Sequence, residues 1–309
     1  MEDINKEHEE FLNRIPDFDV FQNSLNDFLK VDLSNCNDDG IKAVYDKYIR
    51  ILTFPYVLIS KDEFNQNTFY RVRNLPLYSI REDISSISTY SYPLHTICKA
   101  NGRANKKNTT VFYCSDYASA AMLESRQQKD QMGFLGIWKP RVNREVLISC
   151  FLSKILAKGN SMSDTAKQLN EGLLEWTISM GKHKKPQLDL LNDFLFDQFI
   201  HEKKPYALTS WISHQMMYTK LPNKAQTDGI VYPSIESSLR FCNYAFNPQF
   251  ADKFLELEQV IQFTMEMNST GKGSFSMGKI GRPINGKIEW RIPIQSEFEN
   301  FHKTIHIGV

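Results

Sequence analysis

The sequence predicts an α+β fold, with a mixed sheet core and two helical additions. Apolar residues recur at helical spacing over the first sixty residues, short β-rich runs begin near residue 68, and a second helical block interrupts these runs before they return. Because helices and strands alternate irregularly rather than as repeated β–α–β units, this arrangement is favoured over a doubly wound parallel sheet. With 309 residues and 41% hydrophobic content, the chain can bury one sizeable core and a smaller second unit.

Residues 1–60 are expected to form a helical N-terminal region. Two stretches carry apolar residues at i, i+3, i+4 and i+7 spacing, which indicates two amphipathic helices. The first stretch contains Phe21, Leu25, Phe28 and Leu29, and the second contains Ile41, Val44, Tyr45, Tyr48 and Ile49. The segment SNCNDDG at 34–40 lies between them and has the turn and capping residue types that end one helix and begin the next.

Residues 61–309 are expected to form the second unit, a sheet that is interrupted by a helical insertion at about 153–205. The predicted strands are 68–72, 110–114 and 145–152 before the insertion, and 228–234, 257–265 and 287–292 after it. Leucine and phenylalanine at helical spacing predict two helices within the insertion, around 169–178 and 190–199. The basic segment MGKHKKP at 180–186 is expected to be a solvated linker between them.

One short segment imitates a phosphate-binding loop. GSFSMGKI at 273–280 satisfies the G-x-x-x-x-G-K pattern, but Ile280 stands where a Ser or Thr hydroxyl would ligate magnesium. Pro283 and Gly286 follow, where a helix would have to offer its N-terminal amides. We therefore expect a glycine-rich surface turn at 273–280 rather than a phosphate site.

Composition and charge argue against several function classes. Lys and Arg number 37 against 36 Asp and Glu, so no overall field attracts nucleic acid or an acidic membrane, and direct binding to either is not expected. The chain starts with a polar, acidic stretch and has no apolar run near the roughly 20 residues that span a bilayer, which predicts a cytoplasmic protein. Five scattered cysteines without a C-x-x-C pair, and seven histidines without an H-E-x-x-H pattern, predict no metal site.

An ordered set of short motifs carries the functional signal. The motifs are FYRVR (69–73), GRAN (102–105), VFY (111–113), ASAAMLE (118–124) and DGIVYPS (228–234). This order of an arginine in a strand, a Gly-Arg loop, a strand tyrosine, an alanine-rich helix ending in glutamate, and a strand ending in Pro-Ser resembles the RES domain family over about 69–247. The chain differs from the family pattern at Asn101 and Ala104, where the family usually has a glycine and an aromatic residue.

The resemblance implies an enzyme that breaks down NAD and has a fold similar to the ADP-ribosyltransferase toxins. The family is named for its Arg, Glu and Ser, and it supplies the toxin half of many bacterial toxin–antitoxin pairs. NAD is therefore the implied substrate, and the implied partner is an antitoxin with a DNA-binding helix-turn-helix domain. Self-association into a homo-oligomer stays open.

The matching residues have sensible chemical roles in such a reaction. Departure of nicotinamide from its ribose leaves an oxocarbenium-like cation, which Glu124 is expected to stabilise. Arg71 and Arg103 are expected to grip the pyrophosphate, because a guanidinium fork matches paired oxygens better than an ammonium group does. Tyr113 offers a ring face to nicotinamide and a hydroxyl to its ribose, while Ser234 offers a hydrogen bond at the pocket rim.

The predicted site thus has Glu124, Tyr113 and Arg103 as catalytic residues. Its NAD-binding residues are Arg71, Arg103, Asn105, Tyr113 and Ser234. Each residue also has an ordinary structural interpretation, as part of an ion pair, as a core tyrosine or as a turn cap. Their order along the chain favours the functional interpretation.

The sequence therefore predicts a toxin-like enzyme that depletes cellular NAD by cleaving the nicotinamide–ribose bond, by hydrolysis or phosphorolysis. Two alternatives stay open, a non-catalytic binding or scaffold module and an ADP-ribosyltransferase that modifies a protein. The sequence leaves open the acceptor, the antitoxin and the role of the helical additions. Those additions also allow that the chain restrains its own activity until a trigger releases it.

Overall fold

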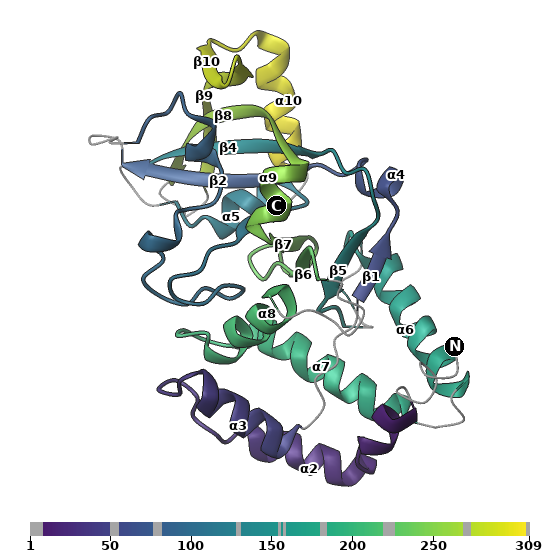
Figure 1. Ribbon diagram of the computed structural model, residues 1–309. Helices are drawn as coiled ribbons and strands as arrows, with labels where there is room; N and C mark the ends of the chain where they lie inside the picture. Colours follow the sequence, from purple (N-terminus) through teal and green to yellow (C-terminus); the bar gives the residue numbers. More distant parts are fainter. Residues whose placement is uncertain are drawn as a thin grey trace.

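The computed structural model describes residues 9–49, 56–76, 82–127, 131–153, 156, 159–179, 184–218, 226–267 and 273–306. Within these residues the fold is α+β, as predicted. Ten strands form one mixed sheet in the order β1-β5-β6-β7-β3-β2-β4-β8-β9-β10 (Figure 1). Within this described sheet, neighbouring strands are antiparallel except for β5 and β6, which run parallel.

The strands match most of the predicted β-rich runs. Their bounds are β1 Tyr56–Ile59, β2 Phe69–Pro76, β3 Phe112–Ser115, β4 Gln131–Pro140, β5 Val146–Cys150, β6 Gly229–Pro233, β7 Cys242–Phe246, β8 Leu255–Met267, β9 Gly273–Ile284 and β10 Lys287–Arg291. The six predicted strands are confirmed as β2, β3, β5, β6, β8 and β10, with bounds that differ by a few residues. Strands β1, β4, β7 and β9 were not predicted.

The central strand β4 escaped prediction because two glycines interrupt its apolar pattern. These glycines make room for aromatic side chains. A Cβ atom at Gly133 would collide with the ring of Phe263, and one at Gly136 would lie 2.8 Å from Nε1 of Trp138. The local sequence therefore looks irregular for a reason that only the packed sheet reveals.

The expectation of a surface turn at 273–280 is wrong, because these residues belong to β9. This strand pairs with β8 and then turns into β10. Its glycines again mark close packing, since a Cβ atom at Gly278 would lie 2.8 Å from Oε1 of Gln262. A strand follows this segment instead of a helix, so the rejection of a phosphate-binding loop agrees with the structure.

Helices confirm the two predicted helical blocks and extend the second. Their bounds are α2 Phe18–Phe28, α3 Asp38–Tyr48, α4 Lys61–Phe64, α5 Ala118–Glu124, α6 Ser163–Ser179, α7 Lys185–His201, α8 Ala207–Tyr218, α9 Pro248–Phe254 and α10 Gln295–His306, with short 3-10 turns at Ile87–Tyr90 and His95–Ile97. Asn37 caps α3 as expected, because its side chain accepts a hydrogen bond from the Gly40 amide at 2.9 Å. Helix α8 continues the helical block beyond residue 205, and residues 180–183 of the predicted linker lie outside the described residues.

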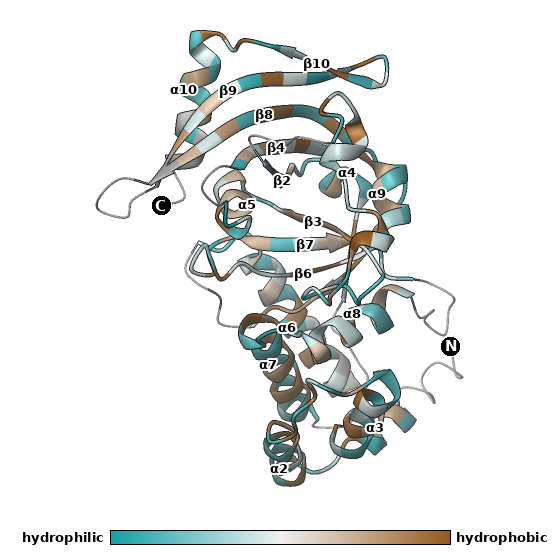
Figure 2. Ribbon diagram, turned by 90° about the vertical axis from the view of Figure 1, so that its left-hand side faces the viewer, coloured by the Kyte–Doolittle hydropathy of each residue, from teal (hydrophilic) through white to brown (hydrophobic). Residues whose placement is uncertain are grey.

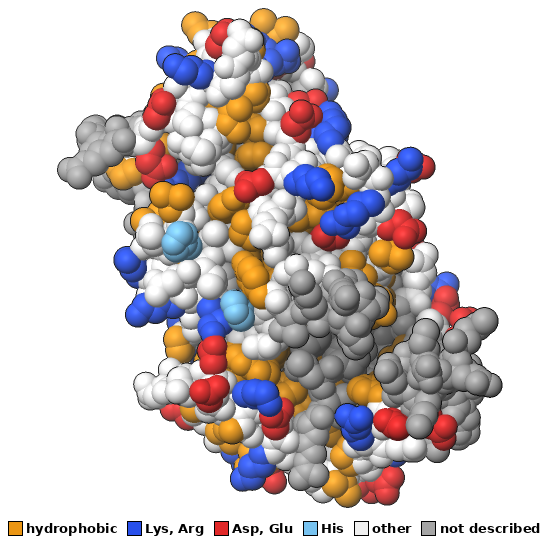
Figure 3. Space-filling model, in the orientation of Figure 1, with side chains coloured by type: hydrophobic (Ala, Val, Ile, Leu, Met, Phe, Trp, Pro, Cys, Tyr) orange, Lys and Arg blue, Asp and Glu red, His pale blue; other side chains and the backbone are white. Residues whose placement is uncertain are grey.

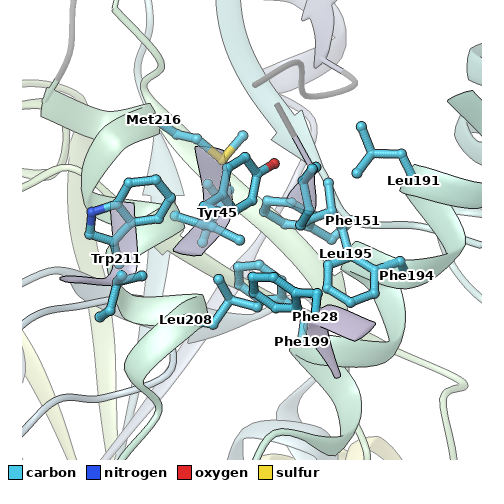
Figure 4. Packing of buried hydrophobic residues seen from close by; sticks show 14 of the residues in the cluster. Phe28, Tyr45, Phe151, Leu191, Phe194, Leu195, Phe199, Leu208, Trp211 and Met216 are labelled. Carbon is cyan, nitrogen blue, oxygen red and sulfur yellow. The ribbon is translucent and has the colours of Figure 1, made fainter. Parts of the chain in front are cut away.

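The N-terminal helices and the insertion form one helical layer, in which α2 and α3 pack on α7 and α8 (Figures 1 and 2). Aromatic rings join the two parts of the chain (Figure 4). The ring of Phe28 lies 5.5 Å, edge-on, from that of Phe194, and the ring of Tyr45 lies 5.3 Å from Trp211. Phe199 in turn stacks on Phe151 beside the sheet at 3.9 Å. The core under this layer therefore runs without a break from α2 to the sheet.

Alternation along the strands shows which cores share a sheet face. Ile230 and Val231 are neighbours on β6 and therefore point to opposite faces of the sheet. Ile230 belongs to the first core, which lies under the helical layer, and Val231 belongs to a second core on the other face. Phe134 and Leu135 on β4 divide in the same way between the second core and a third, which lies under α5 and α10. The first and third cores therefore share one face of the sheet and lie side by side along it.

Candidate active site

A pocket of about 360 Å³ opens on this shared face, between the helical layer and α5. Residues from β2, β3, β6, β7, α5, the Gly-Arg loop and the end of the insertion line it. The structure brings together four of the predicted site residues, Arg71, Arg103, Tyr113 and Glu124, as parts of this lining. Asn105 and Ser234 do not line the pocket but lie directly behind residues that do.

Glu124 is the last residue of α5, whose seven residues make about two helical turns, so the predicted alanine-rich helix ending in glutamate is present. The buried residues Ala118, Ala120 and Ala121 have small side chains, which let this helix lie close to the sheet. The carboxylate of Glu124 is half-buried, and its Oε1 accepts two hydrogen bonds. Ser234 Oγ donates at 2.6 Å and Asn243 Nδ2 donates at 2.9 Å.

Ser234 lies beneath Glu124 and is fully buried, so the predicted position at the pocket rim is wrong. The reason is the hairpin after β6, which folds back so that the Ser234 amide donates to the Phe241 carbonyl at 2.8 Å. The Ser237 amide donates to Ser234 Oγ at 3.3 Å. This leaves the serine's own proton for Glu124, and the serine holds the carboxylate rather than the ligand.

The Gly-Arg loop is held in place by the Tyr113 hydroxyl. This hydroxyl accepts a hydrogen bond from the Ala104 amide at 2.6 Å and donates one to Asn105 Oδ1 at 3.0 Å. Gly102 must stay small, because a Cβ atom there would lie 2.9 Å from the same hydroxyl. The expected hydrogen bond from Tyr113 to a ribose does not fit, since the proton of the hydroxyl is already directed to Asn105. Burial raises the pKa of Tyr113 above its ordinary value, so the hydroxyl stays protonated.

Asn105 was predicted to bind NAD, but the structure gives it another role. Its side chain is 8% exposed, and its Nδ2 donates to the carbonyls of Lys106 and Thr109 at 3.0 and 3.1 Å. All of these bonds lie within the loop. Asn105 therefore shapes the loop that presents Arg103 instead of contacting a ligand.

Arg103 is where the insertion meets the pocket. Its Nη1 donates to the carbonyl of Phe199 near the C-terminus of α7, where unpaired carbonyls favour a cation. Its guanidinium also lies 4.8 Å from the ring centroid of Tyr206. Both residues line the pocket, so the insertion supplies part of the pocket wall.

Arg71 ties two diverging strands together. Strands β2 and β3 pair at Tyr70 and Ser115, and next to this pair Arg71 Nη1 donates to the Tyr113 carbonyl at 2.7 Å. Arg71 Nε donates to the Ser91 carbonyl at 3.0 Å. Burial lowers the pKa of Arg71 to about 10, which still leaves it charged at neutral pH. It thus places a fixed positive charge in the pocket wall.

A third arginine, Arg126, stands at the mouth of the pocket. Its guanidinium forms an ion pair with Glu236, with Nη2 2.5 Å from Oε1, and both residues line the pocket. The side chain of Arg126 is 76% exposed, and its backbone has φ of 46° just after α5, where glycine is the usual residue. In contrast to Arg71 and Arg103, it is mostly exposed, so its guanidinium can exchange Glu236 for a ligand.

Sequence reasoning missed the residues that come from the hairpin and the insertion. Asn243, Tyr206 and Tyr232 all line the pocket. The available signal for Asn243 was a polar residue within a short apolar stretch, CNYAF, which is unusual for a buried strand. Nothing local marks Tyr206, because its place beside Arg103 depends on how the insertion packs.

We also searched the described residues for metal sites, membrane-spanning helices and areas of one charge. No group of three or more His, Cys, Asp or Glu side chains among them could hold a metal ion. No helix in the described ranges is long and apolar enough to cross a membrane. Lys and Arg side chains are interspersed with Asp and Glu over the face in Figure 3, without a broad area of one sign.

The pocket suits an anionic ligand that carries a planar ring. Three guanidinium groups can face phosphate oxygens, tyrosine rings offer flat surfaces, and one anchored carboxylate can face a developing positive charge. In a comparison with known proteins, the family model described as RES domain matches residues 68–267, about two thirds of the chain. No curated protein and no solved structure matches the chain.

Proposed function

Because this chain belongs to the RES domain family, which is associated with NAD-related toxins, we propose that it cleaves NAD between nicotinamide and ribose. One observation carries the proposal. The carboxylate of Glu124 is held through Oε1 by two neutral donors, within a pocket that three arginines line. A carboxylate that is fixed before the substrate arrives stabilises a developing cation without having to reorganise.

The proposed reaction breaks the bond between the nicotinamide nitrogen and C1 of the ribose. The electron pair leaves with the ring, which becomes neutral nicotinamide, and the positive charge moves to the ribose. Glu124 stabilises this oxocarbenium-like cation until an acceptor oxygen forms the new bond to C1 and releases its proton to the solvent. Arg71, Arg103 and Arg126 contribute the positive charge that holds the pyrophosphate meanwhile.

Release of nicotinamide tests the proposal directly. Purified protein is mixed with NAD, and free nicotinamide is followed by chromatography. The control is Glu124→Gln, which keeps the shape of the side chain but removes its charge. We expect turnover by the wild type and a loss of at least about 10²-fold in the variant, as when a transition-state donor is removed. Equal turnover by both proteins would show that Glu124 is not the catalytic carboxylate.

The same experiment identifies the acceptor. Water gives ADP-ribose, inorganic phosphate gives an ADP-ribose phosphate, and a protein target gives a modified protein. Runs with and without phosphate, followed by mass spectrometry of small molecules and protein, separate these outcomes. Absence of any product from NAD would favour the non-catalytic binding module.

We further propose that a separate antitoxin restrains the enzyme in the cell. The described N-terminal residues 9–49 do not line the pocket, so helices α2 and α3 are poorly placed to block it. An acidic tail of a partner could instead pair with the guanidinium groups of the pocket. Expression of the intact chain alone should lower cellular NAD and stop growth, and a neighbouring gene product should relieve this. Normal growth and NAD levels with a soluble, full-length product would contradict the proposal.

A further inference from the structure

We infer that Asn243 is a positioning residue, which decides which oxygen of Glu124 faces the substrate. Asn243 lies on β7, in register with Ser115 of β3 on one side and Tyr232 of β6 on the other. It is 9% exposed, and it is one of the few polar side chains in this part of the sheet. Its Nδ2 points at Glu124 Oε1 from 2.9 Å.

Both hydrogen bonds that the described residues make to this carboxylate end on the same oxygen. Ser234, which directly follows β6, and Asn243 on β7 converge on Oε1 from the two arms of one hairpin. The last torsion of a glutamate side chain is otherwise soft, because rotation about an sp³–sp² bond has a broad energy minimum. Two donors on one oxygen remove this freedom and leave Oε2 for the substrate.

The choice of an amide has a chemical reason. A lysine or arginine at position 243 would also hold Glu124, but its positive charge would offset the charge that the carboxylate must present to the developing cation. An aspartate would repel Glu124. Asparagine donates a hydrogen bond and brings no net charge, so it orients the carboxylate and leaves its charge intact.

Substitutions at position 243 test this role, which rests on the proposed NAD cleavage. Asn243→Leu removes the donor, Asn243→Asp keeps the shape but replaces the donor by a charge, and Asn243→His can restore an N–H near the same point. We expect kcat to fall about 10- to 100-fold for Leu, from loss of a hydrogen bond to a charged group, and further for Asp, with partial recovery for His. KM for NAD should change less than about threefold, because Glu124 acts in the transition state.

The order of the variants distinguishes positioning from packing. If Asn243 only filled space, the isosteric Asp variant would be the mildest of the three, and this result would overturn the inference. The matched control is Asn65→Leu. Asn65 makes a comparable pair of hydrogen bonds to the Val142 backbone, at 2.9 and 2.8 Å, away from the pocket. This control should lose stability and keep the kcat of the wild type.

A measurement without NAD separates this inference from the proposed function. Urea unfolding is measured for Glu124→Ala, Asn243→Leu and the double variant. If the two side chains interact, the double variant shifts the midpoint by less than the sum of the single shifts. Additive shifts would overturn the contact even in an active enzyme. If the wild type releases no nicotinamide, the proposed NAD cleavage is wrong. The urea measurement alone then decides whether Asn243 and Glu124 interact.

Discussion

Replacement of Tyr113 by phenylalanine separates two roles of its hydroxyl. In the structure the hydroxyl serves the Gly-Arg loop, where it bonds to the Ala104 amide and to Asn105 Oδ1. Ala104 is 0% exposed and Asn105 is 8% exposed, so water cannot readily take the place of the hydroxyl. Leaving a buried donor or acceptor unsatisfied costs about 1–3 kcal/mol. Tyr113→Phe leaves two such groups without a partner, the Ala104 amide and Asn105 Oδ1. Because relaxation of the loop recovers part of this cost, we expect the free energy of unfolding to fall by about 2–4 kcal/mol.

Urea unfolding followed by tryptophan fluorescence measures this loss. The matched control is Tyr218→Phe. Tyr218 is 40% exposed, and its hydroxyl donates only a long hydrogen bond, of 3.4 Å, to the Thr110 carbonyl. This control should change the free energy of unfolding by less than about 0.5 kcal/mol. In the Tyr113 variant, KM for NAD should also rise, because a looser loop no longer presents Arg103 in one position.

The opposite result would refute this reasoning. If Tyr113→Phe unfolded like the wild type but lost kcat, the hydroxyl would act on the substrate, as its interpretation from sequence proposes. A loss of stability without any change in KM would instead show that Arg103 does not bind NAD.

Three further predictions follow from the described contacts. Arg103→Lys keeps the charge but loses the planar fork, so KM for NAD should rise by more than the roughly fivefold that an exposed ion pair could explain; an unchanged KM would make Arg103 structural. Burial raises the pKa of Asp116 from 3.8 to about 6, so the folded state keeps a proton that the unfolded state has lost, and the free energy of unfolding should fall as pH rises from about 4 to about 6. Asp116→Asn should remove this fall, and a pH profile that still matches the wild type would assign the dependence to another group. Phe28→Ala, in the core between α2 and α7, should cost about 3–5 kcal/mol of unfolding free energy in urea, and a loss below about 1 kcal/mol would show that α2 docks weakly.

Periodicity in the sequence was enough to predict much of the fold. The helices α2, α3, α6 and α7 and six strands have the local patterns that their burial requires. The central strand β4 was missed because Gly133 and Gly136 interrupt its apolar pattern to make room for the rings of Phe263 on β8 and Trp138 on β4 itself. Strand β9 has the glycine content of a turn for a similar reason, since Gly278 leaves room for Gln262 on β8. The contacts of Gly133 with Phe263 and of Gly278 with Gln262 join different strands, so no local pattern shows them.

The candidate site divides in a similar way. Arg71, Arg103, Tyr113 and Glu124 follow one another in an order that resembles a known family, and the fold brings them to one pocket. Their individual contacts were not predictable, since they depend on the β6–β7 hairpin and on the insertion. Arg103 illustrates this, because its partners Phe199 and Tyr206 both come from the crossover segment that contains the insertion.

The parallel pairing of β5 and β6 has a consequence for how this protein can diversify. Parallel neighbours need a long connection that crosses over, and here the whole insertion fills that connection between Cys150 and Gly229. Added length in such a connection costs little, about 0.6 kcal/mol for each doubling of a flexible loop, so length added outside the packed helices α7 and α8 need not alter the sheet. Yet Phe199 and Tyr206 from the same segment contact Arg103. Sequence drift in the crossover should therefore retune the affinity for the ligand while the fold stays the same.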